Sequence, residues 1–551
     1  MNLEYSYEKN KFIFQCSYFE KDIPKDFGFR WDPKEKHWWT SDVSIAKKAE
    51  NYADAKCLSE IKNKINELEW SFNASTASSS DFKVPCPDGI DFMPFQKAGI
   101  EYASLRPNTL IGDDMGLGKT VQAIGVSNCD KSIDTVLIIC PAAVKINWSR
   151  EWKKWDVKNL SVSVLDAGDP FPGTQVVILN YDIVSKYKNE IDSVKWDLLI
   201  LDEAHNLKNL KAIRTKNILG SREIKPIQAK RKIFLTGTPI LNKPIELWPI
   251  IKTIDPSGLG ASWMKFVERY CNAVKNSFGW SVNGASNLEE LQQIMRSRFL
   301  IRRKKIDVLT ELPPKQRQVI ILEPSREAKS ALQKELEIFN THKKAIDAAK
   351  KSIHNARKSM NREEYKKAIE NLRKVSGLAF TEISKERHRV ALLKLPQIIQ
   401  HVEDSIENGK VILFAHHRDV IDKVQDHFGK KCVIFVGGEK NEIRQKAVDR
   451  FQEDKDCLLF VGGIRAAGVG LTLTAASHVV FSELDWVPGI MSQCEDRAWR
   501  HGQKNSVLVQ HVVLNGSLDQ KMAQALIEKQ EMIDKALDAD KLEMLEEPIT
   551  L

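Results

Sequence analysis

One stretch decides the fold of this sequence: Leu110-Ile111-Gly112-Asp113-Asp114-Met115-Gly116-Leu117-Gly118-Lys119-Thr120. An apolar entry, a glycine-rich turn and an amphipathic run after the threonine predict a strand, a phosphate-binding loop and a helix. Gly116 and Gly118 let backbone N–H groups approach phosphate oxygens, and the helix N-terminus adds its positive dipole end. We expect Lys119 to reach the β- and γ-phosphates and Thr120 to ligate Mg²⁺. Because the strict pattern has glycine in place of Asp113, a chance Gly-Lys-Thr turn stays open.

A second stretch completes the candidate site: Trp196-Asp197-Leu198-Leu199-Ile200-Leu201-Asp202-Glu203-Ala204-His205. Its apolar run predicts a buried parallel strand, and α/β sheets bind ligands at the carboxyl ends of such strands. Asp202 is expected to hold Mg²⁺ through water, and Glu203 to orient and deprotonate the attacking water. By itself, an acidic pair at a strand end is more often a helix cap. Because it follows a phosphate loop by about eighty residues, it predicts a nucleoside triphosphatase.

With 551 residues, the chain is long enough for about three or four domains. At 42% hydrophobic and 28% charged residues, it has the composition of an ordinary soluble protein. No apolar run approaches the length of a membrane span, and Met1–Tyr5 lack a signal-peptide pattern. The nine cysteines include no Cys-x-x-Cys pair, which favours reduced thiols inside a cell over structural zinc. We therefore expect the cytoplasm or nucleoid for a bacterial or viral chain, and the nucleus for a eukaryotic one.

The formal charge of +9 is concentrated in one segment. Between residues 325 and 394 stand 18 Lys and Arg against 9 Asp and Glu, so this segment accounts for the whole excess. A basic helical segment beside a neutral remainder indicates a track for a polyanion. A solvated helical face stays open as the alternative.

Residues 1–60 predict a small α+β module, followed by a polar linker over residues 61–85. Residues 27–39 have the pattern of a β-hairpin with a Pro-containing turn. Cations alternate there with tryptophans, which suits stacking on bases beside phosphate contacts; these residues are Arg30, Lys34, Lys36, Trp31, Trp38 and Trp39. Arg30, Lys36 and Trp38 are therefore candidate DNA contacts. In the alternative interpretation, the tryptophans form the core of the module.

Residues 86–310 predict a first α/β lobe with a helical insertion. Its buried strand patterns are Val136–Cys140, Val176–Leu179, Leu198–Leu201 and Ile233–Leu235. Gln96 lies about twenty residues before the phosphate loop and can give a bidentate hydrogen-bond pair to adenine, which favours ATP. Three residues at strand ends are candidate DNA contacts: Lys145, Asn180 and Tyr181. Three more are expected to couple the nucleotide site to another lobe: His205, Thr236 and Thr238.

Residues 311–395 predict a basic helical protrusion and linker, because this Lys-rich segment has few turn signals. Residues 396–520 predict a second α/β lobe without a phosphate loop of its own. Its strand patterns are Val411–Phe414, Val433–Val436, Leu458–Val461, Val479–Phe481 and Leu508–Val513. Residues 521–551 predict a closing helix and an acidic tail.

Arg497 and Arg500 stand three residues apart, on one face of a predicted helix. If they face the nucleotide of the first lobe, they are arginine fingers that stabilise the charge of the transferred phosphoryl group. A surface arginine pair is the alternative.

These motifs, in this order, resemble a superfamily-two helicase engine. The Asp113–Thr120 loop, the helical insertion and the Arg497–Gln503 block are similar to those of the Swi/Snf family of double-strand DNA translocases. Four stretches resemble the annealing-helicase (HARP-type) branch: Phe92–Gly99, Arg269–Ala273, Leu312–Arg317 and Phe414–His417. The Trp-rich residues 1–60 are similar to the HARP module that precedes that engine, which implies a DNA-junction module.

The resemblance implies an α/β fold with two RecA-like parallel-sheet lobes and helical insertions, preceded by the small α+β module. It implies ATP and Mg²⁺ as nucleotide and metal, and DNA as partner in duplex, fork or junction form, with a monomer away from membranes. It also marks further site residues: Asp114, Met115, Leu117 and Gly470 for ATP, Gln493 for coupling, and His416, Thr472 and Trp486 for DNA.

The function implied is an ATP-driven DNA motor that anneals or regresses strands at fork-like junctions. Trp499 and His501 depart from the family, which usually has His and Ile there, so local packing can differ. Two rival interpretations stay open. The chain can be a strand-separating helicase on DNA or RNA, or a non-enzymatic junction-binding scaffold with a degenerate engine.

Overall fold

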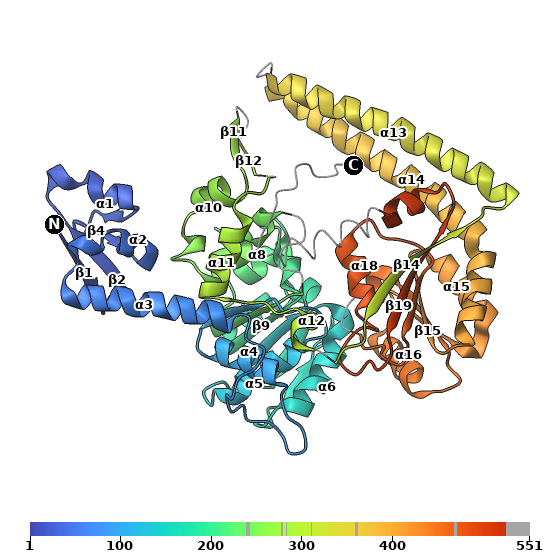
Figure 1. The fold of residues 1–551 in the computed structure, drawn as a ribbon, viewed down its shortest axis with the longest axis horizontal. Helices are drawn as coiled ribbons and strands as arrows, with labels where there is room; N and C mark the ends of the chain where they lie inside the picture. Colours follow the sequence, from blue (N-terminus) through green and yellow to red (C-terminus); the bar gives the residue numbers. More distant parts are fainter. Residues whose placement is uncertain are drawn as a thin grey trace.

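The computed structural model describes residues 1–237, 243–276, 279–282, 284–309, 311–358, 362–467 and 471–524. Three bodies follow one another along the chain: a small sheet module and two parallel-sheet lobes, the second of which carries a long helical hairpin (Figure 1). This arrangement confirms the predicted fold class. Thr238, Gly470 and the predicted acidic tail lie outside the described residues, as does the closing helix from residue 525.

The N-terminal module is an antiparallel sheet with the strand order β1-β2-β4-β3. Its elements are β1 (Asn2–Ser6), β2 (Lys11–Gln15), α1 (Asp22–Phe27), β3 (Arg30–Asp32), β4 (His37–Thr40) and α2 (Val43–Lys48). Cross-strand pairing places Trp38 beside Phe14 and Trp31, on the face that forms the core. Trp39 pairs with Ile13 and Arg30, so it lies on the opposite face. The two neighbouring tryptophans therefore have different roles, one in the core and one on the outer face.

Helix α3 (Ala55–Ala74) replaces the first half of the linker expected over residues 61–85. Its apolar residues recur at helical spacing, with Cys57 and Ile61 buried in the module and Ile65 and Leu68 packed against it. Its C-terminal end reaches lobe 1, where Ser71 Oγ accepts a 2.6 Å hydrogen bond from Arg106 Nη2. A continuous helix, and not a flexible segment, therefore joins the module to lobe 1.

A second contact holds the module on lobe 1. Arg298 forms ion pairs with Asp42 of the module at 2.8 Å and with Asp255 at 3.3 Å. Asp42 also caps α2, since its side chain accepts a hydrogen bond from the Ser44 N–H. The side chain of Arg298 is only 19% exposed, so the pair is partly shielded from water.

Lobe 1 is a seven-stranded sheet in the order β13-β5-β10-β9-β6-β8-β7, in which every pair is parallel. Its strands are β5 (Asn108–Ile111), β6 (Val136–Cys140), β7 (Val162–Val164), β8 (Val176–Asn180), β9 (Trp196–Asp202), β10 (Ala229–Leu235) and β13 (Leu300–Ile301). All four predicted strands are confirmed. Successive residues of β9 enter two different cores, Leu199 and Leu201 on one face and Leu198 and Ile200 on the other. Burial on both faces explains the continuous apolar run.

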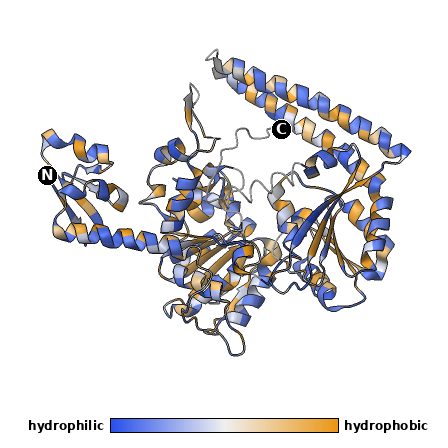
Figure 2. Ribbon diagram, viewed as in Figure 1, coloured by the Kyte–Doolittle hydropathy of each residue, from blue (hydrophilic) through white to orange (hydrophobic). Residues whose placement is uncertain are grey.

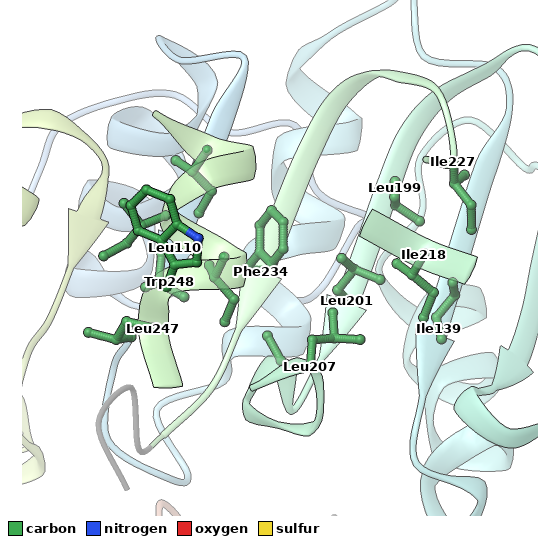
Figure 3. Packing of buried hydrophobic residues seen from close by; sticks show 14 of the residues in the cluster. Leu110, Ile139, Leu199, Leu201, Leu207, Ile218, Ile227, Phe234, Leu247 and Trp248 are labelled. Carbon is green, nitrogen blue, oxygen red and sulfur yellow. The ribbon is translucent and has the colours of Figure 1, made fainter. Parts of the chain in front are cut away.

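Helices cover both faces of this sheet. They are α4 (Pro94–Ser104), α5 (Lys119–Cys129), α6 (Lys145–Trp155), α7 (Lys188–Ser193), α8 (Ile213–Leu219), α9 (Trp248–Ile254), α10 (Trp263–Tyr270) and α11 (Leu288–Arg298). A short hairpin, β11 (Val274–Asn276) and β12 (Gly279–Ser281), belongs to the helical insertion. Figure 3 shows one face, where Leu201 and Phe234 of the sheet lie among Ile218 of α8 and Trp248 of α9.

Lobe 2 is a six-stranded parallel sheet in the order β14-β19-β18-β15-β17-β16. Its strands are β14 (Lys315–Leu322), β15 (Val411–Ala415), β16 (Cys432–Phe435), β17 (Leu459–Gly463), β18 (His478–Phe481) and β19 (Val507–Leu514). Five were predicted, but β14 falls in the segment expected to be protrusion and linker. It is a half-buried edge strand with polar residues along its first half, and it pairs with β19 far along the sequence. Lobe 2 therefore begins near residue 315, and the hairpin is an insertion within it.

The hairpin consists of α13 (Arg326–Lys358) and α14 (Arg362–Ile406). It projects beyond the sheet of lobe 2, and Figure 2 shows blue over much of its length, in contrast to the orange strands. The remaining helices are α12 (Lys305–Val308), α15 (Arg418–Phe428), α16 (Asn441–Glu453), α17 (Ile464–Ala467) and α18 (Pro488–Glu495). None of the helices in the described part of the chain is both long and apolar enough to span a membrane.

Candidate nucleotide site between the two lobes

The phosphate loop joins β5 to α5, as the sequence predicts. Gly116 and Gly118 have φ values of +87° and +70°, which side-chain-bearing residues rarely adopt. A Cβ at Gly118 would lie 2.5 Å from Gln96 Nε2, and one at Gly116 would lie 2.9 Å from Arg500 Cβ. Both the backbone conformation and the close neighbours therefore require glycine at these positions.

Lys119 is the first residue of α5, and its ammonium points into the loop. Nζ donates hydrogen bonds to the backbone oxygens of Asp113 at 2.8 Å and Asp114 at 3.1 Å. Burial lowers the pKa of Lys119, while the carboxylates of Glu203 and Asp202 act in the opposite direction. The lysine thus lies beside the acidic end of β9, as the sequence predicts.

Asp113 occupies the loop position where the strict pattern has glycine. Its carboxylate is fully buried and forms an ion pair with Arg303, and Gln122 Nε2 donates to it at 2.9 Å. Burial raises the pKa of Asp113, but the Arg303 guanidinium and the Gln122 hydrogen bond outweigh this and leave it below its ordinary value. Asp113, at the position where the pattern has glycine, therefore links the loop to Arg303 after β13 through a buried ion pair.

Gln96 lies against the phosphate loop from α4. Its Oε1 accepts from the Met93 N–H at 3.0 Å, and its Nε2 donates to the Leu117 oxygen at 3.4 Å. Leu117 is fully buried and Met115 is 8% exposed. The structure brings these predicted ATP contacts together around one loop, while the pairing of Gln96 with adenine stays a prediction.

Asp202 is the last residue of β9, and three groups fix it in place. Trp148 Nε1 donates to its Oδ2 at 2.8 Å, the Glu203 N–H donates to its Oδ1 at 2.9 Å, and Tyr181 Oη donates to its backbone oxygen at 2.6 Å. Burial raises the pKa of Asp202 to about 6, with Glu203 adding to the rise.

Glu203 has a left-handed backbone, with φ at +48°, which is unfavourable for a residue with a side chain. Such strained positions cluster at functional sites, so the conformation supports a role for this carboxylate. Burial raises the pKa of Glu203, but His205, Lys119 and Arg497 outweigh it and leave it below its ordinary value. Glu203 is therefore ionised at neutral pH, as a general base must be.

His205 connects this segment to the end of β10. Its Nδ1 lies 3.2 Å from Glu203 Oε2 and 3.2 Å from Thr236 Oγ1. The predicted coupling residues His205 and Thr236 are thus in contact.

Arg497 and Arg500 reach the phosphate loop from lobe 2. Arg497 is 5% exposed, and its Nη2 lies 3.4 Å from Met115 Sδ. Both guanidinium groups donate to the backbone oxygen of Leu471, Arg497 at 3.3 Å and Arg500 at 2.9 Å. Burial, together with the charge of Arg497, lowers the pKa of Arg500 to about 10. The pair is therefore an interlobe feature and not a surface pair.

Gln493, the other predicted coupling residue of lobe 2, is 8% exposed on α18. Its backbone oxygen accepts a 2.8 Å hydrogen bond from Arg497 Nε. Gln493 therefore helps to orient the arginine through its backbone, and coupling by its side chain stays a prediction.

Residues 302–305, which we call the interlobe strap, touch both halves of the site. On the loop side, Arg302 Nη1 donates to the Gly112 oxygen at 2.6 Å, and the Lys305 N–H donates to Asp114 Oδ2 at 3.1 Å. On the lobe 2 side, Lys305 Nζ donates to the Trp499 oxygen at 2.7 Å and pairs with Asp496 at 3.1 Å. Burial lowers the pKa of Lys305 to about 8, against the opposing charge of Asp496.

Trp499, one of the departures from the family pattern, packs against the strap. Lys305 and Lys315 lie over its ring at 4.6 and 4.7 Å, and its Nε1 donates to the Pro313 oxygen at 2.7 Å. Trp499 therefore contacts both the interlobe strap and the segment that leads into the first strand of lobe 2.

The site residues fit a nucleotide-bound Mg²⁺. The described part of the chain has no group of three His, Cys, Asp or Glu side chains that could hold a metal alone. Mg²⁺ usually binds through one or two carboxylates together with substrate phosphates and water. Asp202 and the Thr120 hydroxyl beside the loop supply that kind of donor set.

The predicted DNA contacts of lobe 1 are largely internal. Lys145 is 1% exposed, and its Nζ donates to the Leu165 oxygen at 2.9 Å and pairs with Asp166. Tyr181 is 3% exposed and Asn180 is 8% exposed. The lysine ammonium and the tyrosine hydroxyl both have internal partners, so this arrangement does not support their prediction as DNA contacts.

Two of the three candidate DNA contacts of lobe 2 lie beside α14 of the hairpin. Thr472 is exposed, and His416 and Trp486 line one small cavity with Arg387 of α14. Arg387 lies over the Trp486 ring at 4.8 Å. Contact with DNA stays a prediction for these residues.

In the N-terminal module, Arg30 and Lys36 are exposed, but Trp38 packs against the core. Trp39 lies on the outer face instead, with Lys11 at 3.6 Å and Arg30 at 5.7 Å from its ring. The register of the hairpin turns Trp38 toward the core of the module, so the geometry does not support it as a DNA contact, and contact with DNA stays a prediction for Arg30, Lys36 and Trp38.

Sequence reasoning missed three features of the site: Trp148, the interlobe strap and the anchoring role of Asp113. Trp148, Trp152 and Trp155 have helical spacing, which indicates a core face but not a hydrogen bond to the site. The basic run at residues 302–305 was visible, but its partners lie in two separate lobes. These contacts follow only from the packing of distant segments.

Comparison with known proteins gives two family matches. The SNF2-related domain matches residues 65–377, which is more than half of the chain, and the helicase conserved C-terminal domain matches residues 392–502. The chain is 33% identical over 457 residues to the SWI/SNF-related matrix-associated actin-dependent regulator of chromatin subfamily A-like protein 1 of Xenopus tropicalis, covering 81% of this chain and 45% of that one. It is 34% identical over 480 residues to the DNA annealing helicase and endonuclease ZRANB3 of Homo sapiens, covering 82% and 40%. The chain thus spans less than half the length of these relatives.

A solved structure, the Sulfolobus solfataricus SWI2/SNF2 ATPase core in complex with dsDNA, is also similar. It has 23% identity and a TM-score of 0.39, and covers 82% of this chain and 94% of that one. At this TM-score the similarity adds nothing to the assignment.

Proposed function

The chain belongs to the family of proteins with an SNF2-related domain, and on this premise we propose that it is a DNA-stimulated ATPase that translocates on duplex and branched DNA. One observation carries the proposal: Arg497 and Arg500 of lobe 2 lie against the phosphate loop of lobe 1. A site built from two lobes changes when the lobes move, so hydrolysis and motion along DNA are linked.

The residues of the site have distinct chemical roles. Loop N–H groups and Lys119 bind the phosphates of ATP, and Gln96 recognises the adenine. Asp202 and Thr120 would hold Mg²⁺, which would neutralise part of the phosphate charge. Glu203 accepts a proton from the attacking water, and the two arginines stabilise the charge of the transferred phosphoryl group.

Two connections transmit the state of the nucleotide. The interlobe strap joins the phosphate loop to Trp499 and Asp496, next to the arginines. His205 joins Glu203 to Thr236 at the end of the neighbouring strand. We therefore expect loss of the γ-phosphate to alter the packing in both lobes, as part of a cycle of closing and reopening.

We assign the DNA track in part to the basic hairpin. Lys343, Lys344 and Lys351 are exposed on α13, and Lys350 is half-buried beside them. Reversing these four charges should flatten the dependence of DNA affinity on salt, by about one power of salt for each phosphate that is no longer neutralised. Reversal of Lys430, Lys431, Lys446 and Lys455, which are exposed on lobe 2 and lie outside α13 and α14, is the matched control. An unchanged slope in the hairpin variant would show that these lysines are only a solvated face.

The annealing of forked DNA is the finer part of the proposal. One relative is named as a DNA annealing helicase, and the N-terminal sheet presents Trp39 between two cations. An aromatic ring that stacks on an unpaired base contributes about 1–3 kcal/mol, or about tenfold in affinity. Trp39→Ala and Arg30→Ala should therefore lower the preference for forks over duplex, with duplex-stimulated ATPase unchanged.

The decisive experiment is ATPase activity measured in parallel without DNA and with single-stranded, duplex and forked DNA. Lys119→Ala, Glu203→Gln and Arg500→Ala should each abolish turnover, since an arginine finger alone contributes about three orders of magnitude or more. Normal turnover in a folded Arg497→Ala or Arg500→Ala variant would refute the two-lobe site.

The same preparations test the rival functions. Displacement of a strand from blunt and tailed duplexes would identify a strand-separating helicase, and absence of ATPase activity with every DNA would identify a scaffold. We further propose a monomer, located with DNA in the nucleus of a eukaryotic cell or the nucleoid of a bacterium.

A further inference from the structure

Three tryptophans on α6 look equivalent in the sequence but differ in their hydrogen bonds. Trp148, Trp152 and Trp155 are 1%, 0% and 9% exposed. Trp148 Nε1 donates to Asp202 Oδ2 at 2.8 Å, and Trp155 Nε1 donates to Glu151 on its own helix at 3.1 Å. Trp152 Nε1 has no partner within the described part of the chain. Of the three, Trp148 alone contacts a residue of the nucleotide site.

The bond from Trp148 determines how the Asp202 carboxylate is turned. Tyr181 and the Glu203 N–H fix the backbone oxygen and Oδ1, and the indole takes Oδ2. An indole N–H can only donate, so it cannot exchange roles with its partner as a hydroxyl could. Trp148 is 1% exposed, so bulk water does not compete with the indole for this oxygen in the intact protein.

The packing role of Trp148 can be separated from its hydrogen bond. Trp148 and Trp152 belong to the same buried core cluster and stand one helical turn apart. Replacing either tryptophan removes a similar apolar volume, but only the replacement of Trp148 also removes a hydrogen-bond donor to Asp202. A difference between the two variants therefore reports the hydrogen bond.

We propose that Trp148 is a positioning residue that holds the Asp202 carboxylate in the orientation needed by the Mg²⁺ of the bound nucleotide. The inference rests on the proposed ATPase function. Groups that orient metal-binding side chains typically contribute about 10–100-fold to metal affinity or activity. We expect an effect of this size on the Mg²⁺ requirement.

The test compares Trp148→Phe with Trp152→Phe in the full chain. The probe is a fluorescent, non-hydrolysable ATP analogue, titrated over a range of Mg²⁺ concentrations, so that the readout is binding and not turnover. Trp148→Phe should raise the Mg²⁺ concentration for half-maximal affinity by about 10–100-fold, with affinity in the absence of Mg²⁺ unchanged. Trp152→Phe should leave the Mg²⁺ dependence as in the wild type. Equal Mg²⁺ dependence in the two variants would overturn the proposal.

A second variant covers the case in which Trp148→Phe does not fold. Benzothienylalanine at position 148 keeps the shape of the indole but replaces its N–H by sulfur. A raised Mg²⁺ requirement in this protein supports the proposal, and an unchanged one overturns it. Failure of the ATPase proposal is distinguishable, because the wild type would then bind the nucleotide without DNA-stimulated turnover.

Discussion

At the scale of single residues, both the backbone conformation of Gly116 and its close neighbour Arg500 disfavour a substitution to alanine. Its φ is +87°, and a Cβ there would lie 2.9 Å from Arg500 Cβ. Left-handed backbone costs a side-chain-bearing residue about 1–2 kcal/mol, and overpacking adds about 1–3 kcal/mol. Gly116→Ala should therefore lower kcat/KM for ATP by about tenfold or more, measured as DNA-stimulated ATPase.

Gly89 provides a control with the same backbone strain. Its φ is +83°, but nothing lies within 4 Å of the position of a Cβ. Gly89→Ala should lower the thermal stability to a similar degree and leave turnover unchanged. Equal turnover in the two variants would show that lobe 2 does not approach Gly116 during catalysis.

Glu335 predicts a pH dependence of stability. It is 2% exposed, burial raises its pKa to about 7 from an ordinary 4.5, and its Oε2 accepts the Leu518 N–H at 3.1 Å. Between these values the folded chain keeps a proton that the unfolded chain has lost. The stabilisation is therefore fully present below pH 4.5 and is lost as the pH rises through 7, by up to about 1.4 kcal/mol per pH unit.

Glu335→Gln carries a neutral amide at every pH and should not show this loss. Thermal unfolding at pH 6 and pH 8 measures the difference between the two proteins. The wild type should lose stability over this interval relative to the variant. Parallel changes in both would mean that Glu335 is already ionised at pH 6.

At the scale of elements, the sequence predicts best the strands that are buried on both faces. In runs such as Leu198–Leu201 every residue is apolar, which fits a strand covered on both faces. Strand β14 was missed because its first residues, Lys315-Gln316-Arg317-Gln318, are polar, and its stability comes from pairing with β19. The orientation of Trp38 against Trp39 was missed for the same reason, since it depends on register.

The candidate site divides in the same way. The phosphate loop and the acidic pair are local patterns, so Lys119, Asp202 and Glu203 could be identified from sequence. The ion-pair partner of Asp113 and the hydrogen-bond partner of Trp148 lie in distant segments of the sequence, so no local pattern predicts these contacts. Lys145 is a residue for which the local pattern misled: it was a candidate DNA contact, but the loop after β7 buries it and accepts its hydrogen bond.

Helix α3 predicts that the N-terminal module acts as a rigid extension of lobe 1. Asn66 is exposed in the middle of this helix, and proline in a helix interior costs about 3 kcal/mol or more. Asn66→Pro should therefore lower the ratio of fork-stimulated to duplex-stimulated ATPase, while duplex-stimulated activity stays near wild type. Asn66→Ala, which favours the helix, is the control and should keep the full ratio. A normal ratio in the proline variant would show that the module needs only a tether.

At the scale of the whole molecule, two kinds of contact hold the lobes together. Lys305 and Asp496 form a buried pair, with side chains 1% and 13% exposed. Arg150 of α6 and Asp449 of α16 form an exposed pair at 3.3 Å, with side chains 54% and 39% exposed. Water and salt screen the second pair but reach the first one poorly, so the two should differ in strength and in salt dependence.

The exposed pair can be tested by exchanging its charges. An exposed ion pair contributes about 0–1 kcal/mol, so Arg150→Asp and Asp449→Arg should each lower DNA-stimulated ATPase by no more than about fivefold at low salt. The double exchange should restore activity, and the effect should fade at about 0.5 M salt. Lys305→Met should cost more than about tenfold at every salt concentration, because breaking a buried pair is far more costly. If the double exchange does not recover activity, Arg150 and Asp449 are not in contact during turnover, and closure depends on the strap and the arginines alone.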